Sequence, residues 1–187
     1  EKQKKELNEF LKTLNEEQIT FLQNQQGQSQ CLFCSISEKN IDAYKVYEDD
    51  KVMGVLDINP ANKGHVLVFP KKHHQFLGEL NEGVVGLMFN VVNKLSSKMV
   101  ENLKSEGVSI YVANGSGAGQ TVPHISINVI PRFKDDGISF GWNGKKLDKK
   151  DFDNVVKELK TNKIDSKKVK KVKPKIIKAK SFFQRIP

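Results

Sequence analysis

One long helical pattern between two groups of short β-type segments constrains the fold of this chain more than any other feature. From residue 81 to residue 103, apolar side chains recur every three or four positions, which predicts an amphipathic helix capped by Asn81 and extending to Asn102. β-rich runs precede it at 44–47, 51–56 and 65–69, and two more follow it at 108–113 and 124–130. Strands, one long helix and strands again predict an α+β domain whose first three strands form an antiparallel meander.

Further segments flank this domain on both sides. Leu7, Phe10, Leu11 and Leu14 have helical spacing and predict a helical arm, which a Gln-, Gly- and Ser-rich linker at 23–30 joins to the domain. After the last strand, a helix is expected to begin at Asp148 or Asp151 and to run to Leu159. The sequence therefore predicts four parts: an arm with linker (1–30), a domain (31–145), a helix (146–160) and a Lys-rich tail (161–187).

The positive charge of the chain is concentrated in that tail. The whole chain has 31 Lys and Arg against 22 Asp and Glu, and residues 161–187 hold ten of the bases and one of the acids. A Lys-rich segment with so little acid is typical of a phosphate-backbone binder, and a solubilising tail is the alternative. It has no base-reading motif, so we expect sequence-tolerant nucleic-acid binding. Phe182 and Phe183 near its end predict a docking peptide for a protein partner.

No apolar run approaches the roughly 20 residues that cross a bilayer, and the first residues do not form a signal peptide. We therefore expect a cytoplasmic protein without a membrane-spanning helix. The two cysteines, Cys31 and Cys34, are separated by only two residues. In a reducing compartment such a pair is more often a metal clip or a redox motif than part of a disulfide framework.

The strand at 124–130 alternates between polar and apolar residues. Because successive side chains of a strand point to opposite faces, His124, Ser126 and Asn128 should share one face while isoleucine and valine line the other. A Gly-rich turn at 114–120 precedes this strand. Three polar groups in a row beside such a turn favour the floor of a binding site, and a strand with one solvated face is the alternative.

Five segments in unbroken order resemble the histidine triad (HIT) superfamily. They are residues 31–34 (Cys-Leu-Phe-Cys), 46–49 (Val-Tyr-Glu-Asp), 56–60 (Leu-Asp-Ile-Asn-Pro), 63–71 with His73 (beginning Lys-Gly-His), and 118–132 (beginning Ala-Gly-Gln-Thr-Val-Pro-His). The resemblance implies a five-stranded antiparallel sheet with one long helix, and usually a homodimer. It also implies binding of purine nucleotides and cleavage at the α-phosphate through a nucleotidyl-histidine intermediate.

One departure from the family pattern falls on the nucleophile. Members carry His-x-His-x-His with the middle histidine as nucleophile, whereas this chain has His124-Ile-Ser126-Ile-Asn128. A serine hydroxyl needs a base and forms a poorer leaving ester than imidazole does. His124 could be that base, and the Asn128 amide can still donate to a phosphate oxygen. We expect nucleotide binding without the covalent step.

The resemblance also implies a set of metal ligands. Zinc-bearing members hold a structural zinc with the residues that match Cys31, Cys34, His73 and His124, all of which are present here. A free or redox-active dithiol is the alternative, and His74 could replace His73. His65 is expected to orient a group of the site by hydrogen bonding.

The nucleotide contacts implied by the resemblance come from several segments. Asp57 matches the ribose-binding carboxylate, although a turn-capping aspartate is the alternative. Phe33 and Ile58 match the residues that enclose the base, with a core role as the alternative. The phosphate-contacting turn corresponds to Asn114, Gly119, Gln120 and Thr121.

Three functional hypotheses follow for this chain. The first is a HIT-like, zinc-bearing nucleotide-binding protein, a homodimer by resemblance, without covalent catalysis. The second is a working nucleotide hydrolase or transferase in which Ser126 or water attacks phosphorus. The third is a non-catalytic adaptor that acts through its tail.

Overall fold

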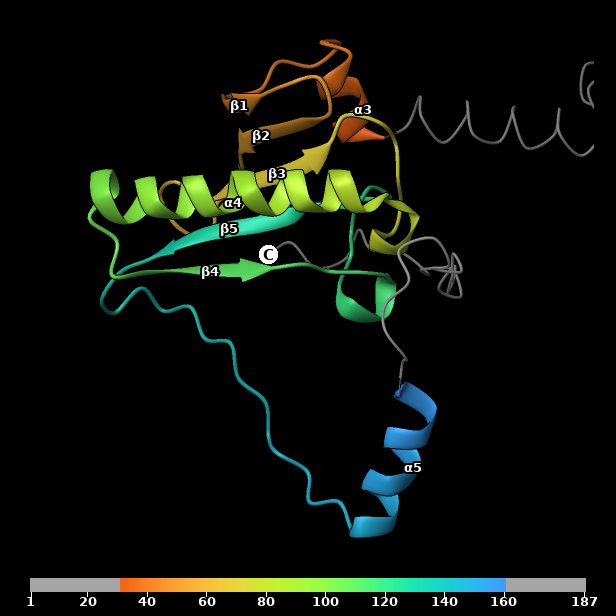
Figure 1. The fold of residues 1–187 in the computed structure, drawn as a ribbon. Helices are drawn as coiled ribbons and strands as arrows, with labels where there is room; N and C mark the ends of the chain where they lie inside the picture. The colour runs from red at the N-terminus through yellow and green to blue at the C-terminus, as the bar shows by residue number, and fades with distance from the viewer. Residues whose placement is uncertain (1–30, 161–187) are drawn as a thin grey trace, which may run out of the picture.

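A computed structural model describes residues 31–160, so the predicted arm and tail lie outside the described residues. Figure 1 shows one sheet with a long helix across it. The strands are β1 (Lys45–Glu48), β2 (Val52–Leu56), β3 (Val66–Pro70), β4 (Gly107–Tyr111) and β5 (Ile127–Arg132). The helices are α3 (Leu32–Ser37), α4 (Glu82–Leu103) and α5 (Lys149–Leu159), with short 3-10 turns η1 (Leu77–Glu79) and η2 (Ser116–Ala118).

All five strands pair antiparallel in the order β1-β2-β3-β5-β4. The first three strands form the predicted meander. The chain then crosses the sheet through α4 and returns as β4 on the outer edge, with β5 inserted beside β3. The predicted α+β class, with a five-stranded antiparallel sheet and one long helix, is confirmed.

Helix α4 forms where the apolar periodicity predicted it. The Asn81 Oδ1 atom accepts a hydrogen bond from the Val84 N–H at 3.0 Å, which satisfies one of the unpaired amides of the first turn. Lys104 ends the helix in a left-handed conformation with φ 59°. Met88, Val91, Val92 and Met99 lie on the buried face of the helix. The helix ends one residue beyond the predicted boundary, within ordinary fraying.

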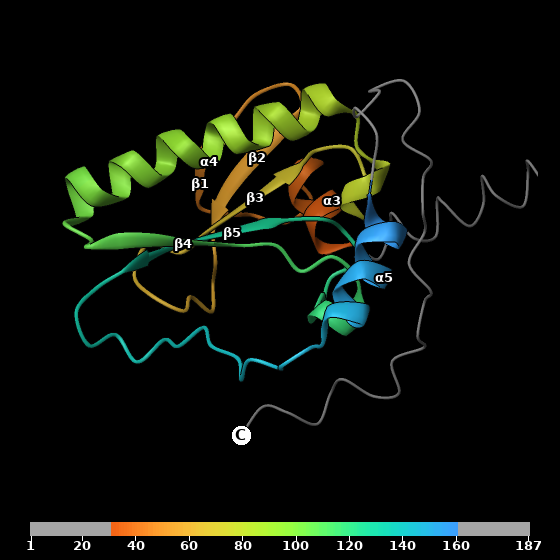
Figure 2. The same cartoon turned by 60° about the horizontal axis from the view of Figure 1, so that its bottom comes forward.

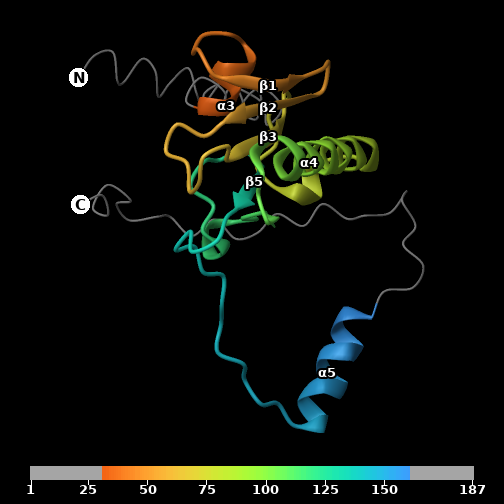
Figure 3. The same cartoon turned by 90° about the vertical axis from the view of Figure 1, so that its left-hand side faces the viewer.

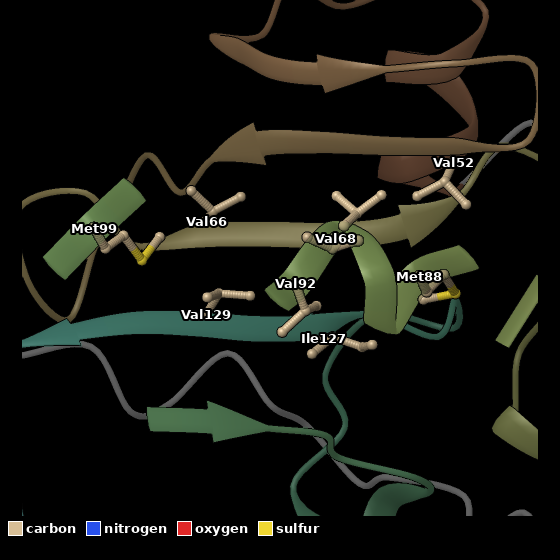
Figure 4. Packing of buried hydrophobic residues seen from close by; sticks show 9 residues of the cluster. Val52, Val66, Val68, Met88, Val92, Met99, Ile127 and Val129 are labelled. Atoms are coloured by element: carbon tan, nitrogen blue, oxygen red, sulfur yellow. The ribbon is translucent and has the colours of Figure 1, made fainter. Parts of the chain in front are cut away.

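The sheet has two different faces. Figure 4 shows Val66, Val68, Ile127 and Val129 of β3 and β5 packed with Met88, Val92 and Met99 of α4. On the opposite face, α3 contributes Phe33 and Cys34 to a second cluster with Met53, Val55 and Phe69. The pleat of β3 separates the two clusters, because Val66 and Val68 point to α4 while Phe69 points to α3. A cavity opens on the face opposite α4, beside α3.

Two local predictions differ from the structure. Strand β5 begins at Ile127 rather than at residue 124, and it extends to Arg132. The reason lies in the backbone: the His124 N–H donates to the Val122 carbonyl at 2.8 Å, and the Ile125 N–H donates to the His74 carbonyl at 2.8 Å. Residues 124 and 125 are thus bonded to loops and not to a neighbouring strand. Helix α3 was not predicted, since six residues are too few to show a helical period.

Beyond β5, residues 133–148 lie outside the sheet, where Phe140 still stacks on Tyr111 of β4, and they lead to α5, as Figures 1 and 3 show. The Asp148 Oδ1 atom accepts from the Asp151 N–H at 2.8 Å, so Asp148 is the cap of the predicted last helix. No residue of α5 is buried. Figure 2 gives a second view of α4 lying across the sheet. Within residues 31–160 there is no helix with the length and apolar character needed to span a bilayer.

Candidate functional site

Two thiols and two imidazoles meet at one end of the sheet. Cys31 caps α3 and Cys34 lies in its first turn, while His73 follows β3 and His124 precedes β5. The donor atoms of these four side chains all lie within 4.8 Å of one another. The Cys34 Sγ atom is 3.2 Å from His73 Nδ1, and the Cys31 Sγ atom is 3.3 Å from His124 Nδ1. The predicted ligand set is therefore assembled from three distant segments.

The orientation of His124 is fixed from its far side. Its Nε2–H donates to the Pro70 carbonyl at 2.8 Å, which leaves Nδ1 directed at the two sulfur atoms. The rings of Phe33 and Phe69 approach the imidazole edge-on at 5.6 and 5.8 Å. Burial lowers the pKa of His124 to about 4, so the ring is neutral at pH 7, as a metal-ligating imidazole must be.

The thiols have the opposite requirement. Burial, followed by the adjacent Cys31 thiol, raises the pKa of Cys34 to about 12, so a cation is needed to hold this sulfur as a thiolate near neutrality. A tetrahedral zinc, with bonds of about 2.3 Å to sulfur and about 2.05 Å to nitrogen, separates a sulfur from a nitrogen ligand by about 3.5 Å. The sulfur–nitrogen distances here are 3.2, 3.3 and 3.7 Å. The donor types and their spacing fit such an ion.

A cavity of about 480 Å³ opens next to this cluster. Its walls come from α3, β2, the loop at 57–59, β4, the turn at 119–122 and the segment leading into β5. Eight of the nine residues predicted for a nucleotide line it: Phe33, Asp57, Ile58, Gly119, Gln120, Thr121, Ser126 and Asn128. His124, Ser126 and Asn128 line it together, as the alternation predicted, although only Asn128 lies within β5.

Asn114, the ninth predicted residue, does not belong to this lining. Its Oδ1 atom accepts a hydrogen bond from the Leu77 N–H at 2.9 Å and so ties the Gly-rich turn to η1. In the structure, the Asn114 side chain therefore holds the Gly-rich turn against η1.

Asn128 is held by His65. The Ala61 N–H donates to His65 Nδ1 at 3.3 Å, so the ring proton is on Nε2, which donates to Asn128 Oδ1 at 3.1 Å. This leaves the Asn128 Nδ2 group as the donor side, 3.4 Å from the Tyr111 carbonyl. The predicted orienting role of His65 matches this geometry.

Asp57 contacts two groups. Its Oδ1 atom accepts from the Asn59 N–H at 2.8 Å, which is the turn-capping contact, and its Oδ2 atom lies 3.5 Å from His65 Nδ1. The same carboxylate lines the cavity, so turn capping and ligand contact do not exclude each other. Asp42 is a second carboxylate of the lining.

The two expected base contacts differ in their surroundings. Phe33 is buried and stacks on Phe69 at 4.4 Å, so it forms a fixed wall. Ile58 is 78% exposed and lies at the rim.

Gln120 braces the glycine turn from within. Its Oε1 atom accepts from the Gly115 N–H at 2.7 Å, while its Nε2 group donates to the Gln75 and Val122 carbonyls at 2.8 and 2.9 Å. Gly119 has φ +86°, a left-handed conformation that disfavours any other residue type. The side chain and the glycine together set the path of this turn.

The cavity lining also contains residues that the sequence analysis did not assign to a site, among them Leu32, Ile36, Ile41, Ala43 and Tyr111. Leu32 and Ile36 lie in α3, which is too short for its apolar residues to show a helical period in the sequence. Tyr111 had no such signal either. Its hydroxyl reaches the turn and donates to the Ala118 carbonyl at 2.5 Å.

The family model of the HIT domain matches residues 38–135 of this chain. An uncharacterized HIT-like protein of Borreliella burgdorferi is 44% identical over 117 residues, which cover 62% of this chain and 84% of that protein. Adenosine 5′-monophosphoramidase of Candida albicans is 32% identical over 147 residues, covering 74% of this chain and 96% of that protein. A Zn-bound histidine triad family protein from Mycobacterium smegmatis superposes with a TM-score of 0.57 and 34% identity, covering 63% and 86% of the two chains.

With more than half of its length matched, the chain belongs to the HIT family. The predicted family and fold are confirmed.

Replacing Gln120 with alanine removes all three of its hydrogen bonds and leaves partly buried backbone groups unpaired. We expect the free energy of unfolding, measured by urea denaturation, to fall by about 1–3 kcal/mol. Thr121→Ala, at the exposed next position, should change it by no more than about 0.5 kcal/mol. Equal losses for the two variants would contradict the bracing role of Gln120.

Proposed function

We propose that this protein binds a purine nucleotide in the described cavity and holds a structural zinc, without forming a nucleotidyl-histidine intermediate. The observation that carries the proposal is Ser126, which lines the cavity where the family pattern has its nucleophile. His124 does not supply a base to Ser126, because its Nε2 is bonded to the Pro70 carbonyl and its Nδ1 faces the two thiols. A serine without a base is a poor nucleophile toward phosphorus.

The binding role rests on what remains in the cavity. Asp57 offers acceptors suited to the ribose hydroxyls, and the Asn128 amide offers a donor to a phosphate oxygen. Residues 119–121 of the turn line the same region, and the Thr121 hydroxyl can donate to a phosphate oxygen there. Phe33 forms an apolar wall for the base with Ile58 at the rim. The similarity to a Candida albicans adenosine 5′-monophosphoramidase supports an adenosine nucleotide as the ligand class.

The zinc part rests on Cys31, Cys34, His73 and His124. A bound zinc would stabilise the two buried thiolates and link α3 to the loops before β5 and after β3. The similarity to a Zn-bound family member supports this metal over a free dithiol. Its contribution is structural, because all four ligand positions are taken by the protein.

Two rival functions make different demands. A hydrolase or transferase that uses Ser126 or a water needs a base, and none of the described contacts places one on the Ser126 hydroxyl. An adaptor needs no nucleotide at all. The expected nucleic-acid binding by the tail and docking by Phe182 and Phe183 fall outside the described residues and stay predictions, as do the homodimer, the four-part division of the chain and the cytoplasmic location.

Titration with AMP tests the binding role. We expect saturable binding by calorimetry, and Asp57→Ala should weaken it about 10- to 100-fold, because a charged acceptor of two ribose hydroxyls is lost. The 2′,3′-dideoxy analogue of AMP should bind the wild type as weakly as AMP binds the variant, and Asp57→Ala should no longer distinguish the two ligands. Asp42→Ala, which removes the other carboxylate of the lining, is the matched control and should keep the preference for ribose.

An absence of AMP binding would favour the adaptor. Equal effects of Asp57→Ala and Asp42→Ala would mean that the cavity senses overall charge and not the ribose hydroxyls.

Turnover of an adenosine phosphoramidate separates binding from catalysis. We expect no release of AMP above the level of a purified Ser126→Ala sample, which controls for contaminating enzyme. Ser126→His restores an imidazole at the nucleophile position, and we expect it to form a covalent adenylyl adduct detectable by mass spectrometry. Turnover by the wild type that disappears in Ser126→Ala would show that the hydroxyl is the nucleophile after all.

Metal analysis of the purified protein should find one zinc per chain. His73→Ala should lower the zinc content and the thermal midpoint, whereas His74→Ala changes the adjacent histidine outside the ligand cluster and should retain the metal. A chelator should lower the midpoint of the wild type and have little effect on His73→Ala. If His74→Ala lost zinc and His73→Ala retained it, His74 and not His73 would be the zinc ligand.

A further inference from the structure

The segment between β5 and α5 exposes two aromatic rings. Trp142 is 89% exposed and Phe140 is 53% exposed, and Trp142 is the one tryptophan of the chain. Exposed apolar patches mark interaction surfaces, whereas single exposed apolar side chains are common on any protein. Figures 1 and 3 show this segment leaving the sheet after β5.

Phe140 is anchored to the sheet although it is exposed. Its ring stacks on Tyr111 at 6.1 Å and 29°, and the Arg132 guanidinium lies 5.7 Å from the ring centre. Arg132 is in turn fixed by Asp136, with Nε–Oδ2 at 2.7 Å and Nη2–Oδ1 at 2.9 Å. Trp142 follows two residues later, so its Cα lies within roughly 7 Å of the Cα of Phe140. Trp142 therefore exposes its ring to solvent only two residues away from the anchored ring of Phe140.

Lysines follow these rings directly. Lys145, Lys146, Lys149 and Lys150 are all exposed. The sequence from 137 to 147 has no acidic residue, Asp148 is the one acid among the four lysines, and Asp151 and Asp153 follow them. Residues 137–187 hold 16 of the 31 Lys and Arg and 5 of the 22 Asp and Glu, a net charge of +11, whereas residues 1–136 carry −2. We call Phe140, Trp142 and these four lysines the aromatic–lysine strip.

The chemistry of the strip selects its partner. Exposed rings beside a row of lysines match a ligand with flat faces on a polyanionic backbone, which is single-stranded nucleic acid. A duplex keeps its base faces stacked inside and would leave Trp142 without a partner. A second copy of the chain would bring a strip of the same sign, which opposes strip-to-strip pairing.

We infer that the aromatic–lysine strip binds single-stranded nucleic acid, with a base stacked on Trp142 and phosphates paired with the lysines. No group of the strip is arranged to read a base edge, so binding is sequence-tolerant. The strip lies outside the cavity proposed for AMP, so the inference does not depend on nucleotide binding in that cavity.

The sole tryptophan makes the test direct. Titrating the full chain with a twelve-nucleotide oligothymidylate should quench the Trp142 emission to saturation. By anisotropy of the labelled oligonucleotide, Trp142→Ala should weaken binding about tenfold, and Trp142→Phe should recover much of the loss. Tyr44→Ala removes a 74%-exposed aromatic elsewhere and should leave the affinity unchanged. The double change Lys145→Gln with Lys146→Gln should reduce the slope of log affinity against log salt by about 1.4.

Three results would overturn the inference. Equal affinity of Trp142→Ala and the wild type would assign binding to the tail alone. Emission that responds to protein concentration and not to the oligonucleotide would assign the strip to a second copy. Emission that shifts with phosphatidylserine vesicles, again without a response to the oligonucleotide, would assign it to an anionic membrane.

Discussion

The contact among two thiols and two imidazoles is the interaction on which the cavity depends. Helix α3 has six residues and its cap makes no side-chain hydrogen bond, and a helix this short is not stable by itself. Cys31 and Cys34 tie it to His73 and His124, and Phe33 then packs on Phe69. Since Phe33 and its helix form one wall of the cavity, loss of this contact removes a wall of the cavity as well as a metal site.

The sequence predicted the parts of the fold that local periodicity controls. Asn81 and the apolar repeat after it determined α4 to within one residue, because cap and period agree. The start of β5 was missed because the His74 carbonyl and the Val122 carbonyl, both outside the strand, bind the amides of residues 125 and 124. Asn114 was assigned to phosphate by family position, and its contact with Leu77 depends on tertiary packing that no local pattern reveals.

The row formed by His124, Ser126 and Asn128 is suited to hydrogen bonding with a ligand. His65 donates to Asn128, and this fixes an amide that can donate to an oxygen but has no proton-accepting nitrogen. His124 is neutral and bonded on both nitrogens. Ser126 lies between His124 and Asn128. Each of these three side chains can form hydrogen bonds, but none of them is a strong nucleophile. Relative to the family pattern His-x-His-x-His, this row therefore lacks two imidazoles and keeps two polar side chains in their place.

Tyr111 links the cavity to the aromatic–lysine strip. It lines the cavity, bonds the Ala118 carbonyl of the glycine turn, and stacks on Phe140. If both proposed sites bind their ligands, a nucleotide in contact with the turn would act on the ring that supports Phe140, and Tyr111 would connect the two sites. Coupling between two binding sites is reciprocal. If a bound nucleotide changes the affinity of the aromatic–lysine strip for nucleic acid by some factor, bound nucleic acid must change the affinity of the cavity for the nucleotide by the same factor. Tyr111→Leu would remove the hydroxyl and the ring contact together, and with them the physical route for that coupling.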